Sequence, residues 1–382
     1  MRIIFWLGEL SIHFSALLQA LQEQGHEVHV CAGEEVSQPR KRLGWGIPDL
    51  GGCQVVTGVD QQQVRRMMCS GLGETVHITT GFRLAFNRLV VTEAGRAGAR
   101  LGLHIEKPTP DGWRVLPKWV VYSRDLRRLR PHLGFLCAVG QMGVDWYRKC
   151  GVPPGSVFPI GYAVEDHRGQ CAPRAGVGRE NDQVRIIFLG QCIPRKRGDL
   201  LLHALAQLQG LSWSCDFVGG GPLEDTWRRL GERLGLDGRV RFLSAVPYDQ
   251  VMGRLQQYDL FVLPSRFDGW GAVVNEALRA GLPVVCSSTC GAADLLGEPW
   301  RGTVFRSGSL SSLAEVLRGW MERGPLPPEE RKRIMQWTDC ITGASMATYL
   351  TAVLSHVYGS GSRPRPPWEV TEPSLATPGG RA

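Results

Sequence analysis

The segment 184–221 reads VRIIFLGQCIPRKRGDLLLHALAQLQGLSWSCDFVGGG and combines two hydrophobic patterns. The apolar runs at 184–189 and 213–218 are short, as in buried strands, whereas the apolar residues of 199–208 recur at helical spacing. A strand, a helix and a second strand in this order form a β-α-β unit with parallel strands. The segment therefore predicts an α/β fold built on a parallel sheet.

The same alternation of strands and helices fills most of the chain, and it occurs twice. The first series begins with RIIFWL at 2–7, and the second begins at 184. Since 382 residues exceed what one hydrophobic core usually organises, we predict two doubly wound Rossmann-like domains facing across a cleft. The predicted units are an N-terminal domain at 1–165, a polar linker at 166–183, a C-terminal domain at 184–326, C-terminal helices at 327–358 and a disordered tail at 359–382.

The composition indicates a globular protein, because 43% of the residues are hydrophobic and 21% are charged. No apolar run approaches the ~20 residues that span a bilayer, and the apolar N-terminus continues into a helical pattern, as a first strand does. We therefore expect a cytoplasmic protein. The net charge of +8 favours anionic partners such as nucleotides or a lipid surface. Nucleic acid is disfavoured, because the basic residues are not interleaved with exposed aromatic residues.

The eleven cysteines are scattered, without a CxxC pair or a cluster with histidine. This distribution predicts neither a metal site nor a disulfide framework.

Two loops that follow strands carry unusual chemistry, in the region where open α/β sheets bind ligands. Arg195, Lys196 and Arg197 stand just before a helix, where basic side chains oppose the helix dipole, so they indicate a phosphate site. A solvated basic turn is the alternative. In the next loop, FVGGGPLED, three glycines allow the backbone to approach a ligand or to turn sharply.

A third loop, PSRFDGWGAVVNEALRAG at 264–281, holds two carboxylates eight positions apart. Asp268 precedes the turn, and Gly269 and Gly271 leave backbone amides uncovered at a helix start that suits a diphosphate. Glu276 lies farther along the helix, where it could accept hydrogen bonds from sugar hydroxyls. The alternative is an ordinary strand-to-helix turn with acidic residues in the first helical turn.

The segments GQCIPRKRG, FVGGGPLED, RVRFLSAVPYDQV and YDLFVLPS, followed by the two acids, occur in the order and spacing found in one family. They resemble the nucleotide-sugar domain of family 4 glycosyltransferases, which have the two-domain GT-B fold. The resemblance is good over 184–314 and looser in the N-terminal half. It implies a retaining transferase that moves a sugar from a nucleotide-diphosphate donor to a saccharide or lipid-linked saccharide, in cell-surface polysaccharide or glycoconjugate synthesis, without a cofactor or metal.

The resemblance also implies roles for particular residues. Asp268 would hold donor-sugar hydroxyls near the reacting carbon, and Glu276 would bind the ribose. Glu106, in HIEKP, would be a second catalytic residue, with His13 and His104 as acceptor-side candidates. The donor diphosphate would lie on Arg195, Lys196, Arg197, Gly269, Trp270 and Gly271, and the nucleotide base near Gly219, Gly220, Gly221 and Pro222.

Three features depart from the family pattern. Asp268 stands where relatives usually have Glu, Gln191 stands where they often have Arg, and WLGELSIHFS replaces a Gly-rich first loop. Asp268 and Gln191 keep open the alternative of a non-catalytic subunit that binds sugar nucleotides. A GT-B nucleotide-sugar epimerase is a further alternative, which fits the cleft but not the segment with the two acids. Asp294, in GAADLL, stands where the family often has an acid.

The C-terminal helices are expected to cross back to the N-terminal domain, as in other GT-B proteins.

Arginines and aromatic residues cluster within 118–149. This cluster suits peripheral contact with an anionic membrane, and a solvated helix face is the alternative interpretation. We therefore expect possible peripheral contact with the inner membrane face.

Overall fold

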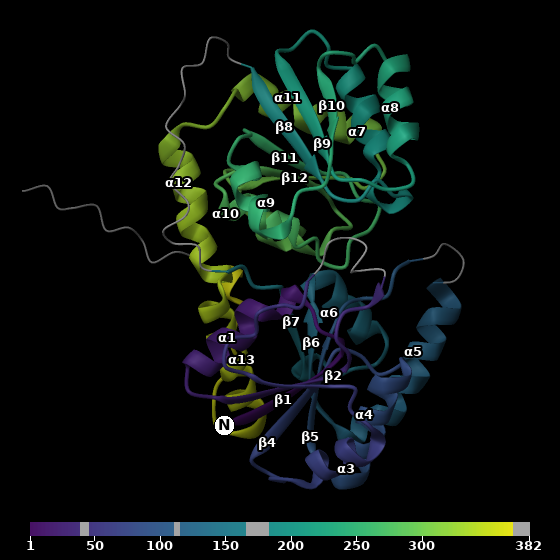
Figure 1. Ribbon diagram of the computed structural model, residues 1–382, viewed down its shortest axis with the longest axis vertical. Helices are drawn as coiled ribbons and strands as arrows, with labels where there is room; N and C mark the ends of the chain where they lie inside the picture. Colours follow the sequence, from purple (N-terminus) through teal and green to yellow (C-terminus); the bar gives the residue numbers. More distant parts are fainter. Residues whose placement is uncertain (39–45, 111–114, 166–182, 370–382) are drawn as a thin grey trace, which may run out of the picture.

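Two parallel sheets, one in each half of the chain, form the framework of the molecule (Figure 1). The computed structural model describes residues 1–38, 46–110, 115–165 and 183–369. Helices cover both faces of each sheet, so the expected doubly wound α/β architecture is confirmed.

Within the described residues, the N-terminal sheet contains seven strands in the order β3-β2-β1-β4-β5-β6-β7. Its central strands are almost wholly buried, because a parallel sheet covered on both faces excludes water from both sides. The strands are β1 (Arg2–Glu9), β2 (Glu27–Glu34), β3 (Gln54–Thr57), β4 (Thr75–Thr79), β5 (Arg100–Ile105), β6 (Leu133–Val139) and β7 (Val157–Ile160).

The C-terminal sheet, in the part of the chain from 183 to 369, contains six strands in the order β10-β9-β8-β11-β12-β13. The order reverses direction between β8 and β11, and this is the position where open α/β sheets bind their ligands. The strands are β8 (Val184–Leu189), β9 (Trp213–Val218), β10 (Val240–Leu243), β11 (Leu260–Leu263), β12 (Val284–Ser287) and β13 (Gly302–Phe305).

The helices pack their apolar stripes against these sheets. In the N-terminal domain they are α1 (Ser15–Glu23), α3 (Gln61–Cys69), α4 (Ala85–Ala97), α5 (Val115–Leu129) and α6 (Gly140–Lys149). In the C-terminal half they are α7 (Gly198–Ala206), α8 (Glu224–Arg233), α9 (Tyr248–Leu255), α10 (Val273–Arg279), α11 (Leu310–Arg323), α12 (Pro328–Trp337) and α13 (Gly343–Tyr358).

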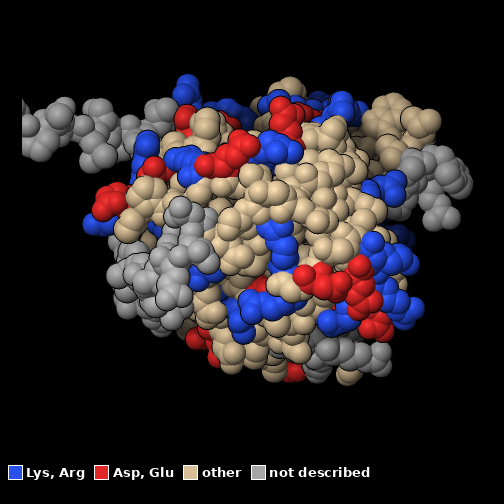
Figure 2. Space-filling view, turned by 90° about the horizontal axis from the view of Figure 1, so that it is seen from above, with Lys and Arg blue, Asp and Glu red and all other residues tan. Residues whose placement is uncertain are grey.

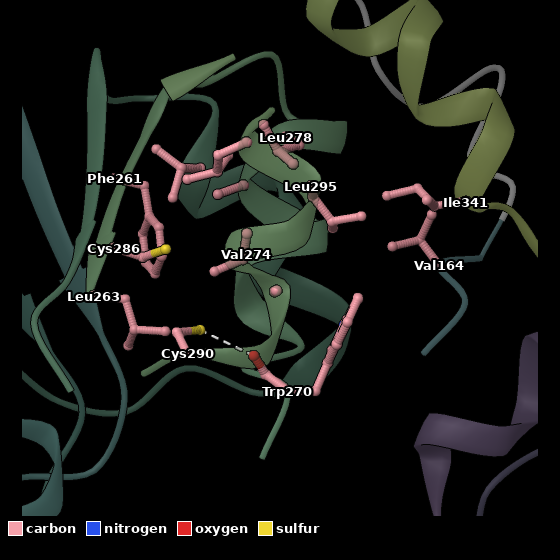
Figure 3. Close-up of a cluster of buried hydrophobic side chains, with 14 of the residues drawn as sticks. Val164, Phe261, Leu263, Trp270, Val274, Leu278, Cys286, Cys290, Leu295 and Ile341 are labelled. Atoms are coloured by element: carbon pink, nitrogen blue, oxygen red, sulfur yellow. Dashed lines mark hydrogen bonds between the residues drawn. The ribbon is translucent and has the colours of Figure 1, made fainter. Parts of the chain in front are cut away.

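The chain passes between the domains at two places that lie side by side. Val164 donates its amide to the carbonyl of Ile341 at 3.1 Å, and Gly343 donates to the carbonyl of Val164 at 3.2 Å. Figure 3 shows Val164 and Ile341 next to each other, across from the apolar cluster of the C-terminal domain. Beyond this crossing, α13 packs against α1, and a side chain at Gly343 would collide with the backbone of Ala16.

The segment 359–369 corrects the expectation of a disordered tail from 359 onward. Arg363 donates to the carbonyls of Gly155 at 2.8 Å and Val157 at 2.5 Å, and its guanidinium lies 4.3 Å from the centre of the Phe158 ring. Trp368 is 7% exposed. The abundance of Pro and Gly made this segment look unstructured, but one arginine and one tryptophan give it specific partners. Residues 370–382, and the expected linker except Gln183, lie outside the described residues.

The surface carries charges of both signs. Seen from above in Figure 2, groups of Lys and Arg side chains lie near groups of Asp and Glu at several places, with uncharged surface between them. The net positive charge of the chain therefore does not form a field of one sign on this face.

Candidate active site

Asp268 is the centre of a buried ionic cluster beyond the end of β11. Its side chain accepts hydrogen bonds from Arg195 Nη1 to Oδ1 at 2.7 Å and from Lys196 Nζ to Oδ2 at 2.7 Å. Ser265 Oγ donates to Oδ2 at 3.0 Å. Asp268 is 7% exposed and Lys196 is 9% exposed, so both charges are largely removed from water. The structure thus brings together an acid and two bases that lie more than 70 positions apart in the sequence.

The two cations decide the ionisation of Asp268. Burial alone disfavours the carboxylate, but Lys196 and Arg195 outweigh this effect, and the pKa of Asp268 lies below its ordinary value. The cluster therefore keeps an anion and two cations together at neutral pH. A diphosphate that arrived here would compete with Asp268 for the two cations.

Arg197 does not join this cluster. Its backbone has φ 52°, which places it in the left-handed region just before α7. Its Nε donates to Asp199 Oδ1 at 3.0 Å. Of the three basic residues predicted to bind phosphate, Arg195 and Lys196 therefore face Asp268, and Arg197 is paired with the first turn of its own helix.

The three glycines after β9 pack against the loop after β8. A side chain at Gly219 would collide with the carbonyl of Gly190, and one at Gly221 would approach the carbonyl oxygen of Cys192 to 2.8 Å. The amide of Cys192 donates to the carbonyl of Gly220 at 2.8 Å. Pro222 follows in the turn that leads to α8. These glycines thus fix the loop after β9 against the loop after β8.

The loop from Gly269 to Gly271 is anchored by the buried side chain of Trp270. Trp270 is 1% exposed, and its Nε1 donates to Asn275 Oδ1 at 2.9 Å. Asn275 Nδ2 in turn donates to the carbonyl of Tyr162 at 2.6 Å. Figure 3 shows the carbonyl oxygen of Trp270 facing the Cys290 sulfur, which donates to it at 2.9 Å. Trp270 is therefore an anchor of the loop, with its ring turned away from solvent.

Sequence reasoning missed Asn275. It lies beside Glu276 in α10, and it is 1% exposed although it is polar. Its two hydrogen bonds join the Trp270 side chain to the chain segment that crosses between the domains. In the sequence, its position in the mostly apolar stretch VVNEAL at 273–278 was the only indication of a buried polar side chain.

Glu276 lines a cavity between the domains. The cavity is bounded by the first loop, the crossing segment, α9 and α10, through residues that include His13, Glu165, Tyr248 and Glu276. Burial raises the pKa of Glu276 to about 7, and the nearby carboxylate of Glu165 adds to this effect. Within the described residues, no hydrogen bond or ion pair reaches the Glu276 side chain. The cavity thus places a carboxyl group where a polar ligand could supply its missing partners.

On the N-terminal domain, Glu106 follows β5 and its side chain is exposed. Tyr162 Oη donates to Glu106 Oε1 at 2.5 Å, and Tyr147 Oη donates to the backbone carbonyl of Glu106 at 2.8 Å. A side chain at Gly269 would collide with the Glu106 carboxylate. Glu106 and the Gly269 loop therefore touch across the domain boundary.

The rings of His13 and His104 both lie nearly parallel to the ring of Tyr162. The His13 ring stacks on Tyr162 with a centroid distance of 4.8 Å, and the His104 ring lies parallel at 6.1 Å. His104 is buried, and burial lowers its pKa to about 4, so it is neutral at physiological pH. His13 borders the cavity that contains Glu276. The two histidines therefore have different environments, and His13 is the one that can meet a ligand.

Asp294 joins the two domains on the other side of the Gly269 loop. Its Oδ2 accepts the backbone amide of Gln141, at the start of α6, at 2.5 Å. A side chain at Gly140 would approach Gly291 to 3.2 Å, so the two backbones nearly touch. Burial raises the pKa of Asp294 to about 6, although the hydrogen bond from Gln141 acts in the opposite direction. Asp294 therefore caps a helix of the opposite domain.

The described part of the chain contains no group of three or more His, Cys, Asp or Glu side chains arranged to hold a metal ion. Its ten cysteines are free thiols.

Two parallel α/β domains that meet around an ionic cluster and a cavity define a protein of the GT-B class. Solved structures confirm the fold. HepE of Anabaena in complex with UDP has a TM-score of 0.68 at 16% identity, covering 93% of this chain and 100% of that chain. The lipopolysaccharide outer core galactosyltransferase WaaB has a TM-score of 0.68 at 12% identity, covering 93% and 99%.

Residues 173–336 match the family model described as glycosyl transferases group 1. In this stretch the chain is therefore similar to the group 1 glycosyltransferases. It is 28% identical over 241 residues to the GDP-mannose-dependent alpha-(1-6)-phosphatidylinositol monomannoside mannosyltransferase of Mycolicibacterium smegmatis, covering 59% of this chain. It is 30% identical over 160 residues to the D-inositol 3-phosphate glycosyltransferase of the same species, covering 40% of this chain. The matches span 62% and 36% of the lengths of these relatives.

Proposed function

We propose that the protein is a retaining glycosyltransferase that moves a sugar from a nucleotide-diphosphate donor to a saccharide or lipid-linked saccharide. The observation that carries this proposal is the cluster of Asp268 with Lys196 and Arg195. The cluster lies next to half-buried Gly269, which in turn contacts the Glu106 carboxylate of the other domain. It combines cations for a leaving diphosphate with carboxylates from both domains. Relatives that use nucleotide sugars support the assignment.

In the proposed reaction, the bond between the anomeric carbon of the donor and the diphosphate oxygen breaks. The acceptor oxygen forms its new bond on the same face, and its proton passes to the leaving diphosphate. Lys196 and Arg195 would stabilise the negative charge that develops on the diphosphate, which is the kind of preorganised electrostatic effect that often dominates catalysis. We propose that these two cations take the role of a metal ion, so that no metal or other cofactor is required.

Asp268 would bind hydroxyl groups of the donor sugar, and Glu106 would orient the reacting sugar from the opposite domain. Glu276 would accept the ribose hydroxyls in the cavity that it lines with His13. Because its pKa is about 7, Glu276 can act as either an acceptor or a donor near neutral pH. Arg197 is outside this proposed set, since it is paired with Asp199.

A thermal-shift screen with UDP-, GDP-, ADP- and TDP-sugars, followed by an assay of donor hydrolysis without acceptor, tests the proposal. A donor at 100 times its Kd should stabilise the protein by about 2.7 kcal/mol, which raises Tm by several degrees. Hydrolysis of the same donor would distinguish a transferase from a subunit that only binds it. An epimerase would release a changed sugar nucleotide. The absence of both stabilisation and turnover with all four donor types would refute the proposal.

We further propose peripheral contact of α5 with an anionic membrane surface, which would place the enzyme at the cytoplasmic face. The helix exposes Leu116 (72%), Trp119 (41%) and Val120 (57%) near its start. Exposed arginines follow them at Arg124, Arg127, Arg128 and Arg130. Apolar side chains beside basic ones suit a lipid headgroup region. Each basic residue near an anionic surface contributes about 1 kcal/mol to the free energy of binding. No helix in the described part of the chain is both long and apolar enough to span a bilayer.

Co-sedimentation with vesicles tests this contact. Binding to anionic vesicles should be weak, absent with neutral vesicles, and lost as salt is raised, because salt screens surface charge. Replacing Arg127 and Arg128 together by Gln should weaken it about 10-fold or more. The matched control replaces Arg229 and Arg318, which are exposed on the C-terminal domain, and should leave binding unchanged. Equal behaviour of the two double variants, or no binding at low salt, would contradict membrane contact through α5.

A further inference from the structure

The segment 359–369, which we call the C-terminal strap, lies against both domains. Its first anchor is Arg363, whose guanidinium donates to two carbonyls beside β7 and covers the ring of Phe158. Its second anchor is Trp368, in a short 3-10 helix at Pro367–Glu369. This helix packs against α13 and against the crossing segment at Thr338–Ile341. The strap therefore connects the N-terminal sheet to the point where the chain crosses between the domains.

Trp368 reaches the loop that carries the proposed diphosphate-binding amides. Its ring centroid is 5.9 Å from that of Trp270, with 53° between the ring planes. A side chain at Gly161 would collide with the six-membered part of the Trp270 ring. Trp270 is thus enclosed by Trp368 of the strap and by Gly161 of the crossing segment, while Asn275 holds its indole nitrogen.

This enclosure fixes the backbone between Gly269 and Gly271. Two glycines in four residues give the loop many alternative conformations, and Gly271 adopts φ 92°, which other residues rarely adopt. The backbone of the loop is bonded at the Trp270 carbonyl, which accepts the Ala292 amide at 2.8 Å, and at the Gly271 carbonyl, which accepts the Val274 amide at 2.8 Å. The buried Trp270 ring adds a side-chain anchor between the two glycines. Removing the ring that covers Trp270 would leave a cavity and free this anchor.

We propose that Trp368 is a positioning residue for the donor loop. It acts through Trp270, does not touch the substrate itself, and keeps the amides of Gly269 and Gly271 aimed at the leaving diphosphate. This inference rests on the proposed function for its catalytic consequence. Its structural part, the ordering of the loop by the strap, can be measured without any substrate.

The first measurement is hydrogen exchange of the unliganded full chain, followed in peptides that cover 265–275. Trp368→Ala should accelerate exchange of this loop at least 10-fold, and Trp368→Phe should restore most of the protection. Trp320→Ala is the matched control, because Trp320 is also 7% exposed and its Nε1 bonds to Thr303 on the edge strand β13. It should lower stability to a similar extent and leave exchange of 265–275 unchanged. Equal exchange in wild type and Trp368→Ala would overturn the proposal.

The second measurement is turnover of UDP-glucose or GDP-mannose, whichever wild type hydrolyses. Trp368→Ala should lower kcat about 10- to 100-fold with a smaller change in KM, since misplacement of about 1 Å can cost 10²-fold. Arg363→Ala, which loosens only the distant anchor, should lower kcat less. If Trp320→Ala lowers kcat as much as Trp368→Ala, the effect is general destabilisation and the positioning role is wrong. If wild type turns over neither donor while the exchange result holds, the proposed function fails for these donors and the strap's structural role stands.

Discussion

The carboxylates of Asp268 and Glu106 stand on opposite domains, and they are held in opposite ways. Asp268 is buried between two cations and a hydroxyl group. Glu106 is exposed and receives a hydrogen bond from the phenol of Tyr162, whose ring lies nearly parallel to two histidine rings. The donor side is thus organised by buried ion pairs, and the acceptor side by stacked rings and a hydrogen bond from a phenol to an exposed carboxylate.

This difference predicts how each side responds to substitution. Removing one partner of a buried ion pair leaves the other charge buried without compensation, so the donor side should be sensitive to the loss of any one charge. Stacked rings tolerate small changes, because their packing is spread over many weak contacts. Substitutions on the donor side should therefore have larger effects than substitutions on the acceptor side.

The largest effect is expected for Lys196→Ala. It removes a buried charge that pairs with Asp268, and with it a cation for the leaving diphosphate. Loss of one such preorganised group typically lowers kcat by about 10²–10³-fold. Steady-state kinetics with the donor found by the screen measures it. Arg197→Asn is the control, because Asn tolerates the left-handed backbone at this position and Arg197 is paired with Asp199. Comparable losses in both variants would show that the basic loop acts as a whole.

A somewhat smaller effect is expected for Asp268→Asn. The variant keeps the shape of the side chain but leaves Arg195 and Lys196 without their anion, so turnover should fall about 10²-fold while donor affinity changes only a few-fold. Isothermal calorimetry and single-turnover rates separate the two quantities.

Asp268→Glu sharpens the same comparison. A gain of activity would show that the shorter acid is a handicap, and a loss would show that the pocket is built around it. Unchanged turnover in both variants would remove Asp268 from the proposed mechanism.

Glu276→Gln should have effects of opposite sign on stability and on binding. The folded-state pKa of Glu276 is about 7, above its ordinary value of 4.5, so wild type loses stability as pH rises from about 4.5 to 7. The Gln variant lacks this loss and should be more stable at pH 8 by about 1–3 kcal/mol. Its donor affinity should fall about 10-fold, because a charged acceptor of ribose hydroxyls is gone.

Urea denaturation at pH 5 and pH 8 checks the stability of Glu276→Gln, and calorimetry checks its affinity. Glu93→Gln is a control in which the change in stability should have the opposite sign. The pKa of Glu93 is lowered, mainly by the hydrogen bond from Arg65, so its ionised form stabilises the fold. It should be less stable than wild type at pH 8. A Glu276→Gln protein that loses stability at pH 8 would contradict the argument.

The smallest effect is expected for Tyr162→Phe. The ring stack with His13 and His104 remains, and the hydrogen bond from the phenol to Glu106 Oε1 is lost. We expect a fall in kcat of about 3- to 10-fold, because water competes for the exposed Glu106 carboxylate and reduces the worth of this hydrogen bond to about 1 kcal/mol. A loss as large as that of Lys196→Ala would show that the acceptor side depends on this phenol and that the contrast between the two sides is wrong.

Much of this molecule follows from its sequence alone. The alternation of short apolar runs with helical stretches determines the α/β class, because a strand buried on both faces must be apolar throughout. The GT-B resemblance rests on motifs within 184–285, where the donor-side residues Lys196, Asp268 and Glu276 lie. Each of these motifs is a short continuous segment, so the residue types and their spacing in the sequence are enough to identify it.

Only the tertiary structure decided which of these residues meet. Arg195 and Arg197 are two positions apart, yet a left-handed residue at 197 sends one side chain to Asp268 and the other to Asp199. Trp368 lies in a segment whose composition resembles a disordered tail, but it packs against Trp270 almost a hundred positions away. Such contacts depend on how distant segments pack together, and burial of one aromatic ring can order a segment that local propensity leaves undetermined.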